Sequence, residues 1–192
     1  MDTTDEITEL SSKDEPRLKP IDNPAGIKLK LAYWFTKKKL GKVITPVKVV
    51  QARMPETLSL SQKLMSIEDN LSLSDELIFY IKSFVATLNG CSFCIDIAKA
   101  DAQGNIDISK YEQLLNYQSS DVFDKSEKAA LQYVEQATLE KQVGDAVFEE
   151  LQTHYNENEI VEITWLNALE NYYNLINRPL GIASDSLCNS QP

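Results

Sequence analysis

The sequence is poor in the two residue types that most often interrupt regular structure, with 6 glycines and 7 prolines among 192 residues. Loop-rich folds and all-β folds need many turn residues, so this scarcity argues against both. No convincing β-strand is visible either, because the valine-rich segments at 43–44 and 47–50 are short and lie between prolines. Apolar residues make up 43% of the chain, which is enough for a packed core. We therefore predict an all-α protein.

Other absences exclude whole classes of protein. Three cysteines are too few for a disulfide-stabilised scaffold in a chain of this length. The net charge of −10 argues against a nucleic-acid partner, because phosphate contacts need a basic surface. No apolar run approaches the roughly 20 residues that a membrane-spanning helix needs. The acidic and polar start of the chain does not resemble a secretory signal peptide, so we expect a cytoplasmic protein with reduced thiols.

Composition divides the chain into one predicted domain and two tails. Residues 1–22 are rich in acidic residues, serine, threonine and proline, and we predict a disordered acidic tail there. Residues 23–179 carry regularly spaced apolar residues and are predicted to form a single all-helical domain. Residues 180–192, which include Cys188, are predicted to be a loose C-terminal tail.

Helical periodicity and capping signals locate the helices of that domain. The clearest helix covers 74–89, because Leu77, Ile81, Phe84 and Leu88 recur at helical spacing. Capping boxes, in which a cap residue is followed three positions later by glutamate, begin at Ser109, Asp124 and Asn156. The other predicted helices cover 24–40, 56–69, 91–103, 109–117, 124–140, 145–154 and 156–177.

Charge is distributed unevenly in the N-terminal part of the chain. The segment 28–53 has eight basic residues and no acidic one. Prolines at 46 and 55 predict an extended connector there, because a residue before proline is pushed out of the α region. An acidic partner, an anionic membrane surface or a neighbouring subunit could bind this segment. We favour a solvated helix face, so membrane contact through 28–53 is not expected.

The segment with a chemical signature is 88–96, which holds two cysteines spaced Cys-x-x-Cys. The pair Asn89-Gly90 is expected to end one helix. Cys91 would then lie on the first turn of the next helix, and Cys94 one turn further along on the same face. The exposed N–H groups and partial positive charge of a helix N-terminus favour a thiolate, which lowers a thiol pKa and makes a dithiol reactive.

Four interpretations of this cysteine pair compete. A zinc site needs about four cysteine or histidine ligands. The other candidate ligands, His154 and Cys188, do not form a second paired motif, so we predict neither a metal nor another cofactor. A thioredoxin-type site needs a βαβ context, which the sequence does not supply. Two buried cysteines that act as small apolar residues are the structural alternative, and a redox-active dithiol in a helical scaffold is the remaining interpretation.

The run Ala-Thr-Leu-Asn-Gly-Cys-Ser-Phe-Cys-Ile-Asp at 86–96 resembles the signature of the carboxymuconolactone decarboxylase-like superfamily. The similarity is closest to its alkyl hydroperoxidase D-like, peroxidase-related branch, and it covers roughly residues 45–180. The resemblance implies an all-helical fold with the Cys-x-x-Cys at the N-terminus of a central helix, usually in a symmetric oligomer. It also implies thiol-dependent reduction of hydroperoxides. Weaker similarities follow in the family's order at 104–109, 125–131, 159–163 and 177–178.

Two positions of the family's proton relay are changed in this chain. In the redox branch, two residues relay protons to the thiol. One is a histidine four residues after the second cysteine, and the other is a glutamate about twelve residues before the first cysteine. Ala98 and Phe79 occupy these positions here. Glu76, one turn from Phe79 on the same predicted helix, is a candidate substitute acid, although stabilisation of the helix N-terminus would also explain it. Tyr80 and Lys99 are further candidate proton donors.

The predicted function is that of a thiol-dependent hydroperoxide reductase with a Cys91/Cys94 redox pair. One thiolate attacks the hydroperoxide and becomes a sulfenic acid, the other cysteine closes a disulfide, and an external thiol reductant resets the pair. The family resemblance favours Cys94 as the attacking residue, whereas the helix dipole favours Cys91, so the assignment stays open. The alternatives are a catalytically degenerate binding or assembly module and a dithiol redox sensor. The expected partners are a small hydroperoxide, the reductant and further copies of the chain.

Overall fold

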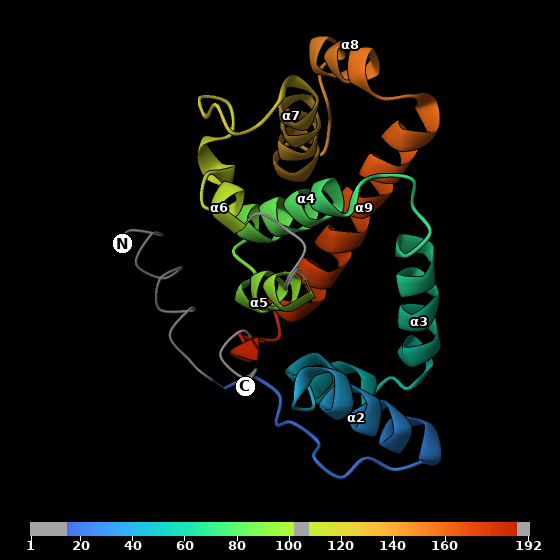
Figure 1. The fold of residues 1–192 in the computed structure, drawn as a ribbon. Helices are drawn as coiled ribbons and strands as arrows, with labels where there is room; N and C mark the ends of the chain where they lie inside the picture. Colours follow the sequence, from blue (N-terminus) through green and yellow to red (C-terminus); the bar gives the residue numbers. More distant parts are fainter. Residues whose placement is uncertain (1–14, 102–107, 188–192) are drawn as a thin grey trace.

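The computed structural model describes residues 15–101 and 108–187 (Figure 1). All regular structure within these ranges is helical, which confirms the predicted all-α class. None of the described helices is long and apolar enough to span a lipid bilayer. The predictions for residues 1–14 and for Cys188 lie outside the described residues.

The body of the molecule is organised around one central helix, α4 (Asp75–Leu88). Helices α5, α7 and α9 all pack against α4, and α8 packs against α7 (Figure 1). Eight residues of α4 are buried, because apolar residues occur around most of its circumference. The remaining elements of the body are α5 (Ser92–Asp101), α6 (Ile108–Tyr111), a 3-10 turn η2 (Leu114–Asn116), α7 (Lys125–Leu139), α8 (Asp145–His154) and α9 (Glu157–Asn177).

Side-chain caps fix the starts of three of these helices. The Ser74 hydroxyl accepts a hydrogen bond from the Leu77 N–H, at 3.2 Å, at the start of α4. Asp124 and Asn156 form complete capping boxes at the starts of α7 and α9. The predicted capping boxes at Asp124 and Asn156 are therefore confirmed, and these three helices begin within one residue of the predicted bounds. The capping box predicted at Ser109 is wrong, because α6 begins at Ile108 and ends at Tyr111, and the rest of the predicted helix 109–117 contains the 3-10 turn η2.

The two α-helices of the N-terminal arm, residues 27–68, lie outside this body. The arm consists of α2 (Ile27–Leu40), a short π-helix η1 (Val47–Gln51) and α3 (Glu56–Glu68). The main contacts of α2 and α3 are with η1, and α3 has no buried residue. Figure 1 shows α2 and α3 outside the group formed by α4, α5, α7 and α9.

The extended connector predicted between the prolines at 46 and 55 is wrong, because η1 is helical. Pro46 has helical backbone angles, φ −57° and ψ −37°, and precedes the first residue of η1. Proline is tolerated there because the N–H that it lacks would have no partner inside the helix. Val47 and Val49 are buried, so packing stabilises the turn that the local pattern did not predict.

The described ends of the chain also differ from the predicted disordered and loose tails. The Arg17 N–H donates to the Leu180 carbonyl at 2.9 Å, which joins the two ends directly. Ile182 and Leu187 are buried, with 3% and 2% of their surface exposed. Short polar segments with isolated apolar residues give no periodic signal, so this packing could not be inferred from the pattern.

Candidate functional site

A tight turn at the end of α4 positions the first cysteine. The Gly90 N–H donates to the Thr87 carbonyl at 3.0 Å, and the Cys91 N–H donates to the Ala86 carbonyl at 2.8 Å. These are the two hydrogen bonds of a Schellman motif, with Gly90 as its left-handed residue at φ 64°. The turn places Cys91 against the C-terminal end of α4.

Cys91 also begins the next helix. Its carbonyl accepts from the Ile95 N–H at 3.0 Å, so Cys91 is the N-cap residue of α5 and Cys94 is the third residue within it. The two cysteines form a disulfide, with Cα atoms 5.3 Å apart. The predicted place of the Cys-x-x-Cys at a helix N-terminus is confirmed, with Cys91 one position before the first turn rather than on it. The site is thus described in its oxidised form.

Both cysteines are closed off from solvent. Cys91 and Cys94 are 1% and 3% exposed, within a small apolar cluster drawn from several elements. Val49 of the arm and Ile182 of the C-terminal segment belong to this cluster. A reagent can therefore reach the sulfurs only after a covering segment moves. Ala86 and Phe93 complete the buried members of the cluster.

A second turn of the same type brings Ile182 to the cysteines. At the end of α9 the Gly181 N–H donates to the Arg178 carbonyl at 2.9 Å, and the Ile182 N–H donates to the Asn177 carbonyl at 3.0 Å. Gly181 has φ 65°, as a left-handed cap requires. The two motifs thus place the residues that follow their glycines, Cys91 and Ile182, in one cluster.

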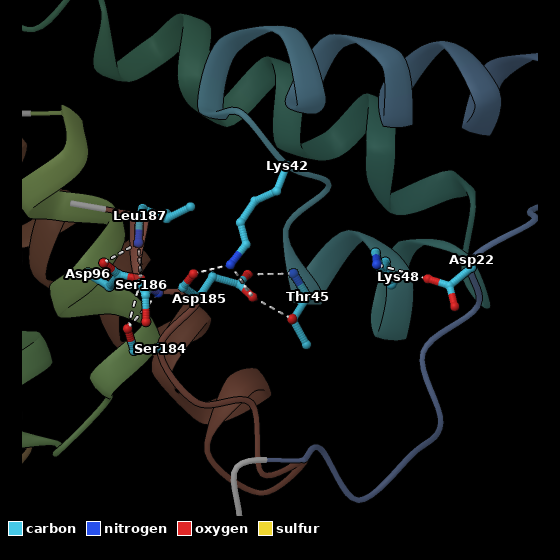
Figure 2. Close-up of polar contacts among 9 residues, drawn as sticks. All are labelled: Asp22, Lys42, Thr45, Lys48, Asp96, Ser184, Asp185, Ser186 and Leu187. Carbon is cyan, nitrogen blue, oxygen red and sulfur yellow. Dashed lines mark hydrogen bonds and ion pairs between the residues drawn. The ribbon is translucent and has the colours of Figure 1, made fainter. Parts of the chain in front are cut away.

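Residues 182–187, which we call the C-terminal strap, are held on α5 by a buried carboxylate. Asp96 accepts hydrogen bonds from the Leu187 N–H at 2.9 Å and from the Ser184 hydroxyl at 2.9 Å (Figure 2). Asp96 itself is 7% exposed. Both carboxylate oxygens of Asp96 are therefore directed at the strap.

The same strap is joined to the connector that follows α2. The Asp185 carboxylate accepts from the Thr45 N–H and the Thr45 hydroxyl, both at 2.7 Å, and pairs with the Lys42 ammonium at 3.9 Å (Figure 2). A neighbouring ion pair joins Lys48 and Asp22 at 2.8 Å. The strap therefore links the N-terminal arm, α5 and the end of α9 around the disulfide.

Several polar residues of α9 lie on one face of the helix, and one of them contacts Cys94. We call Asn167, Glu170, Asn171, Asn174 and Asn177 the amide face of α9; all are buried except the half-buried Asn171. The Asn177 side-chain N–H donates to the Cys94 sulfur, with Nδ2 and Sγ 3.5 Å apart.

The amide face also fixes the turn before Cys91. The Asn89 side-chain amide donates to the side-chain oxygen Oδ1 of Asn174 at 2.8 Å and to Oδ1 of Asn171 at 3.0 Å. The Asn174 amide in turn donates to Glu170 at 2.7 Å. Burial raises the pKa of Glu170 from 4.5 to about 7, against the opposing effects of the Lys82 charge and the Asn174 hydrogen bond. The interior beside α4 therefore contains a carboxyl group that titrates near neutrality.

The two changed relay positions are part of the apolar core. Ala98 and Phe79 are 6% and 5% exposed and belong to the main hydrophobic cluster of the body. Glu76 lies in the first turn of α4, where it accepts a hydrogen bond from the Tyr80 hydroxyl at 2.8 Å. Its backbone is about 18 Å along α4 from Leu88, at 1.5 Å per residue, so the structure does not bring Glu76 to the cysteines.

The other candidate proton donors also interact elsewhere. The Lys99 ammonium lies over the Tyr111 ring, 4.2 Å from its centre. His154, at the end of α8, lies 3.2 Å from a Glu150 carboxylate oxygen. Sequence analysis missed the amide face and the strap. The asparagine spacing of three or four residues in α9 was a usable signal for the amide face, since asparagine disfavours helix interiors.

Comparisons with known proteins point to one group. No family model matches the chain. The uncharacterized protein YdfG of Bacillus subtilis is 32% identical over 104 residues, which are 53% of this chain and 71% of YdfG. A crystal structure from Agrobacterium tumefaciens, of a protein of unknown function described as a putative antioxidant defence protein AhpD, is 25% identical with a TM-score of 0.65. It covers 71% of this chain and 96% of that one.

Two further solved structures share the fold at lower identity. An uncharacterized peroxidase-related protein from Silicibacter sp. TM1040 superimposes with a TM-score of 0.76 at 19% identity, over 91% of this chain and 94% of that one. The debrominase Bmp8 superimposes with a TM-score of 0.72 at 18% identity, over 89% of this chain and 93% of that one. The fold therefore accommodates more than one named activity, and the reaction must be argued from the site.

Proposed function

Because this chain belongs to the alkyl hydroperoxidase D-like, peroxidase-related group with the carboxymuconolactone decarboxylase-like fold, we propose that it is a thiol-dependent hydroperoxide reductase. The observation that carries the proposal is the Cys91–Cys94 disulfide at the N-terminus of α5. Two cysteines that close a disulfide within one helical turn can store and release two electrons. The helix N-terminus adds a favourable field for the thiolate that the reaction requires.

The two cysteines and an external dithiol supply the electrons that reduction of the hydroperoxide requires. A cysteine thiolate attacks the distal oxygen of the hydroperoxide, the O–O bond breaks, and the leaving alkoxide takes up a proton and departs as an alcohol. The attacking sulfur is oxidised by two electrons to a sulfenic acid. The second cysteine attacks this sulfur, the disulfide forms, and water leaves. The external dithiol then returns two electrons and two protons.

The burial of the pair supports a second candidate function. Sulfurs that are 1% and 3% exposed can react only when the covering strap or arm moves. A protein that opens rarely would oxidise slowly and act as a dithiol redox sensor instead of an enzyme. A catalytically degenerate assembly module is the third candidate, and it requires that the pair never cycles at all.

Turnover measurements on cysteine variants distinguish the candidates. The reduced protein is supplied with an organic hydroperoxide and a dithiol reductant, and consumption of the hydroperoxide is followed. We expect turnover by the wild type and by C188S, a control that keeps the pair, and background rates for C91S and C94S. Background rates in all four proteins would exclude the peroxidase. Disulfide formation without turnover would then favour the sensor, and no disulfide formation the assembly module.

A further inference from the structure

We infer that the side-chain amide of Asn177 stabilises the thiolate of Cys94 and thereby makes Cys94 the attacking sulfur, an inference that rests on the proposed function. Asn177 would act directly on the reacting atom, at a site where the family's relay histidine and glutamate are replaced by Ala98 and Phe79. The structure offers an amide donor in place of the missing acid–base groups.

The geometry of the contact supports this role. The Asn177 Nδ2 atom lies 3.5 Å from the Cys94 Sγ atom, and the two residues are 4% and 3% exposed. A disulfide sulfur is a weak acceptor, whereas a thiolate carries a full negative charge and accepts a stronger, charge-assisted hydrogen bond. The interaction therefore strengthens when the disulfide is reduced, which is the state that attacks the substrate.

The position of Asn177 is fixed by its own backbone. Its carbonyl accepts the Ile182 N–H at 3.0 Å in the Schellman motif that ends α9. The next helical turn toward the N-terminus carries Asn174, which is bonded to Asn89 and Glu170. The backbone of Asn177 is thus held by a turn on one side and by α9 on the other, so little backbone reorganisation is needed when the charge develops.

Without this donor, the surroundings would suppress the thiolate. The cluster around the pair is apolar, and burial in apolar surroundings raises a thiol pKa. Both cysteines gain from the N-terminus of α5, Cys91 as its N-cap and Cys94 as its third residue. Cys94 has the Asn177 amide in addition, so it is the sulfur more stabilised as a thiolate, and Cys91 closes the disulfide.

Thiolate titrations in single-cysteine proteins test this inference without hydroperoxide. The pKa of Cys94 is measured in a C91S/C188S background, and that of Cys91 in a C94S/C188S background, from the ultraviolet absorbance of the thiolate. We expect N177L to raise the Cys94 pKa by about one unit or more, because the thiolate loses a charge-assisted hydrogen bond that the thiol does not need. The Cys91 pKa should change much less.

Two further variants keep the result interpretable. N177D, which replaces the donor with a negative charge, should raise the Cys94 pKa further than N177L and remains informative if N177L does not fold. N158L replaces an exposed asparagine at the start of α9, at the opposite end of the helix from Asn177, and should leave the Cys94 pKa within a few tenths of a unit. An unchanged Cys94 pKa in both Asn177 variants, or an equal shift of both cysteines, would overturn the inference. Failure of the peroxidase assay would leave these titrations unaffected.

Discussion

The body and the N-terminal arm are both helical but differ in how many of their residues are buried. In the body, α4 and α9 each bury eight residues, including polar ones such as Glu170 and Asn174. In the arm, α3 buries none, and Trp34 and Phe35 of α2 are 60% and 56% exposed. Helical periodicity shows that a face is suited to burial, but it does not show where its partner lies.

The outer face of α2 combines apolar and basic groups. Ile27 and Leu31 are 78% and 59% exposed on the same face as Trp34 and Phe35. The Lys38 ammonium lies over the Trp34 ring at 5.2 Å, and both residues line a surface hollow of about 300 Å³. Large exposed apolar groups that gather in this way mark interaction sites more often than isolated ones do. The following predictions test whether the arm and the body differ as the burial indicates.

The largest expected effect comes from a matched pair of isoleucine substitutions. Ile163 of α9 is 0% exposed and Ile67 of α3 is 47% exposed. I163A should lower the free energy of unfolding by roughly 2–5 kcal/mol, because it removes buried methyl groups and leaves a cavity. I67A should change it by less than about 0.5 kcal/mol. Urea unfolding at low protein concentration measures both, and equal losses would show that the arm is as well packed as the body.

The second prediction concerns the charge buried inside the body. A carboxyl group whose pKa rises from 4.5 to about 7 on folding binds its proton more tightly in the folded state. Stability should therefore fall as the pH rises from 4.5 to about 7, by up to roughly 3 kcal/mol. E170Q, which keeps an acceptor for Asn174, should remove this part of the pH dependence, whereas E149Q at an exposed position should not. An unchanged pH profile in E170Q would show that Glu170 ionises freely.

The sequence predicted local features well and long-range features poorly. The caps Asp124 and Asn156 and the cysteine position follow from residues within one helical turn, so a linear pattern contains them. The bond from Leu187 to Asp96 joins residues 91 positions apart, in a segment without periodicity. The sequence identified Asn177 only as part of a weak family similarity at 177–178. No local pattern predicts that its side-chain amide contacts the Cys94 sulfur.

The third prediction compares how the contacts of Asp96 with the strap and a nearby surface ion pair affect reduction of the disulfide. D96A leaves the buried Leu187 N–H and the Ser184 hydroxyl without this acceptor. The closed position of the strap should then be about 1–3 kcal/mol less stable relative to the open one. The disulfide should then be reduced by an external dithiol about tenfold faster or more, since 1.4 kcal/mol corresponds to a factor of ten. K48A, which removes the neighbouring ion pair with Asp22, is the control and should have little effect. An unchanged reduction rate in D96A would mean that reagents reach the cysteines by another route.

The smallest effect on the isolated chain is expected on the outer face of α2. F35S should change the free energy of unfolding at low concentration by less than about 0.5 kcal/mol, because Phe35 is already 56% exposed. We expect further copies of the chain, and if they cover this face, the same change should weaken self-association strongly, which sedimentation at increasing concentration measures. Direct pairing of two α2 faces about a two-fold axis would bring their lysines together. In such an assembly, α2 would therefore bind a more acidic surface of the second copy. Equal association of F35S and wild type would place the interface elsewhere and leave the arm a solvated face.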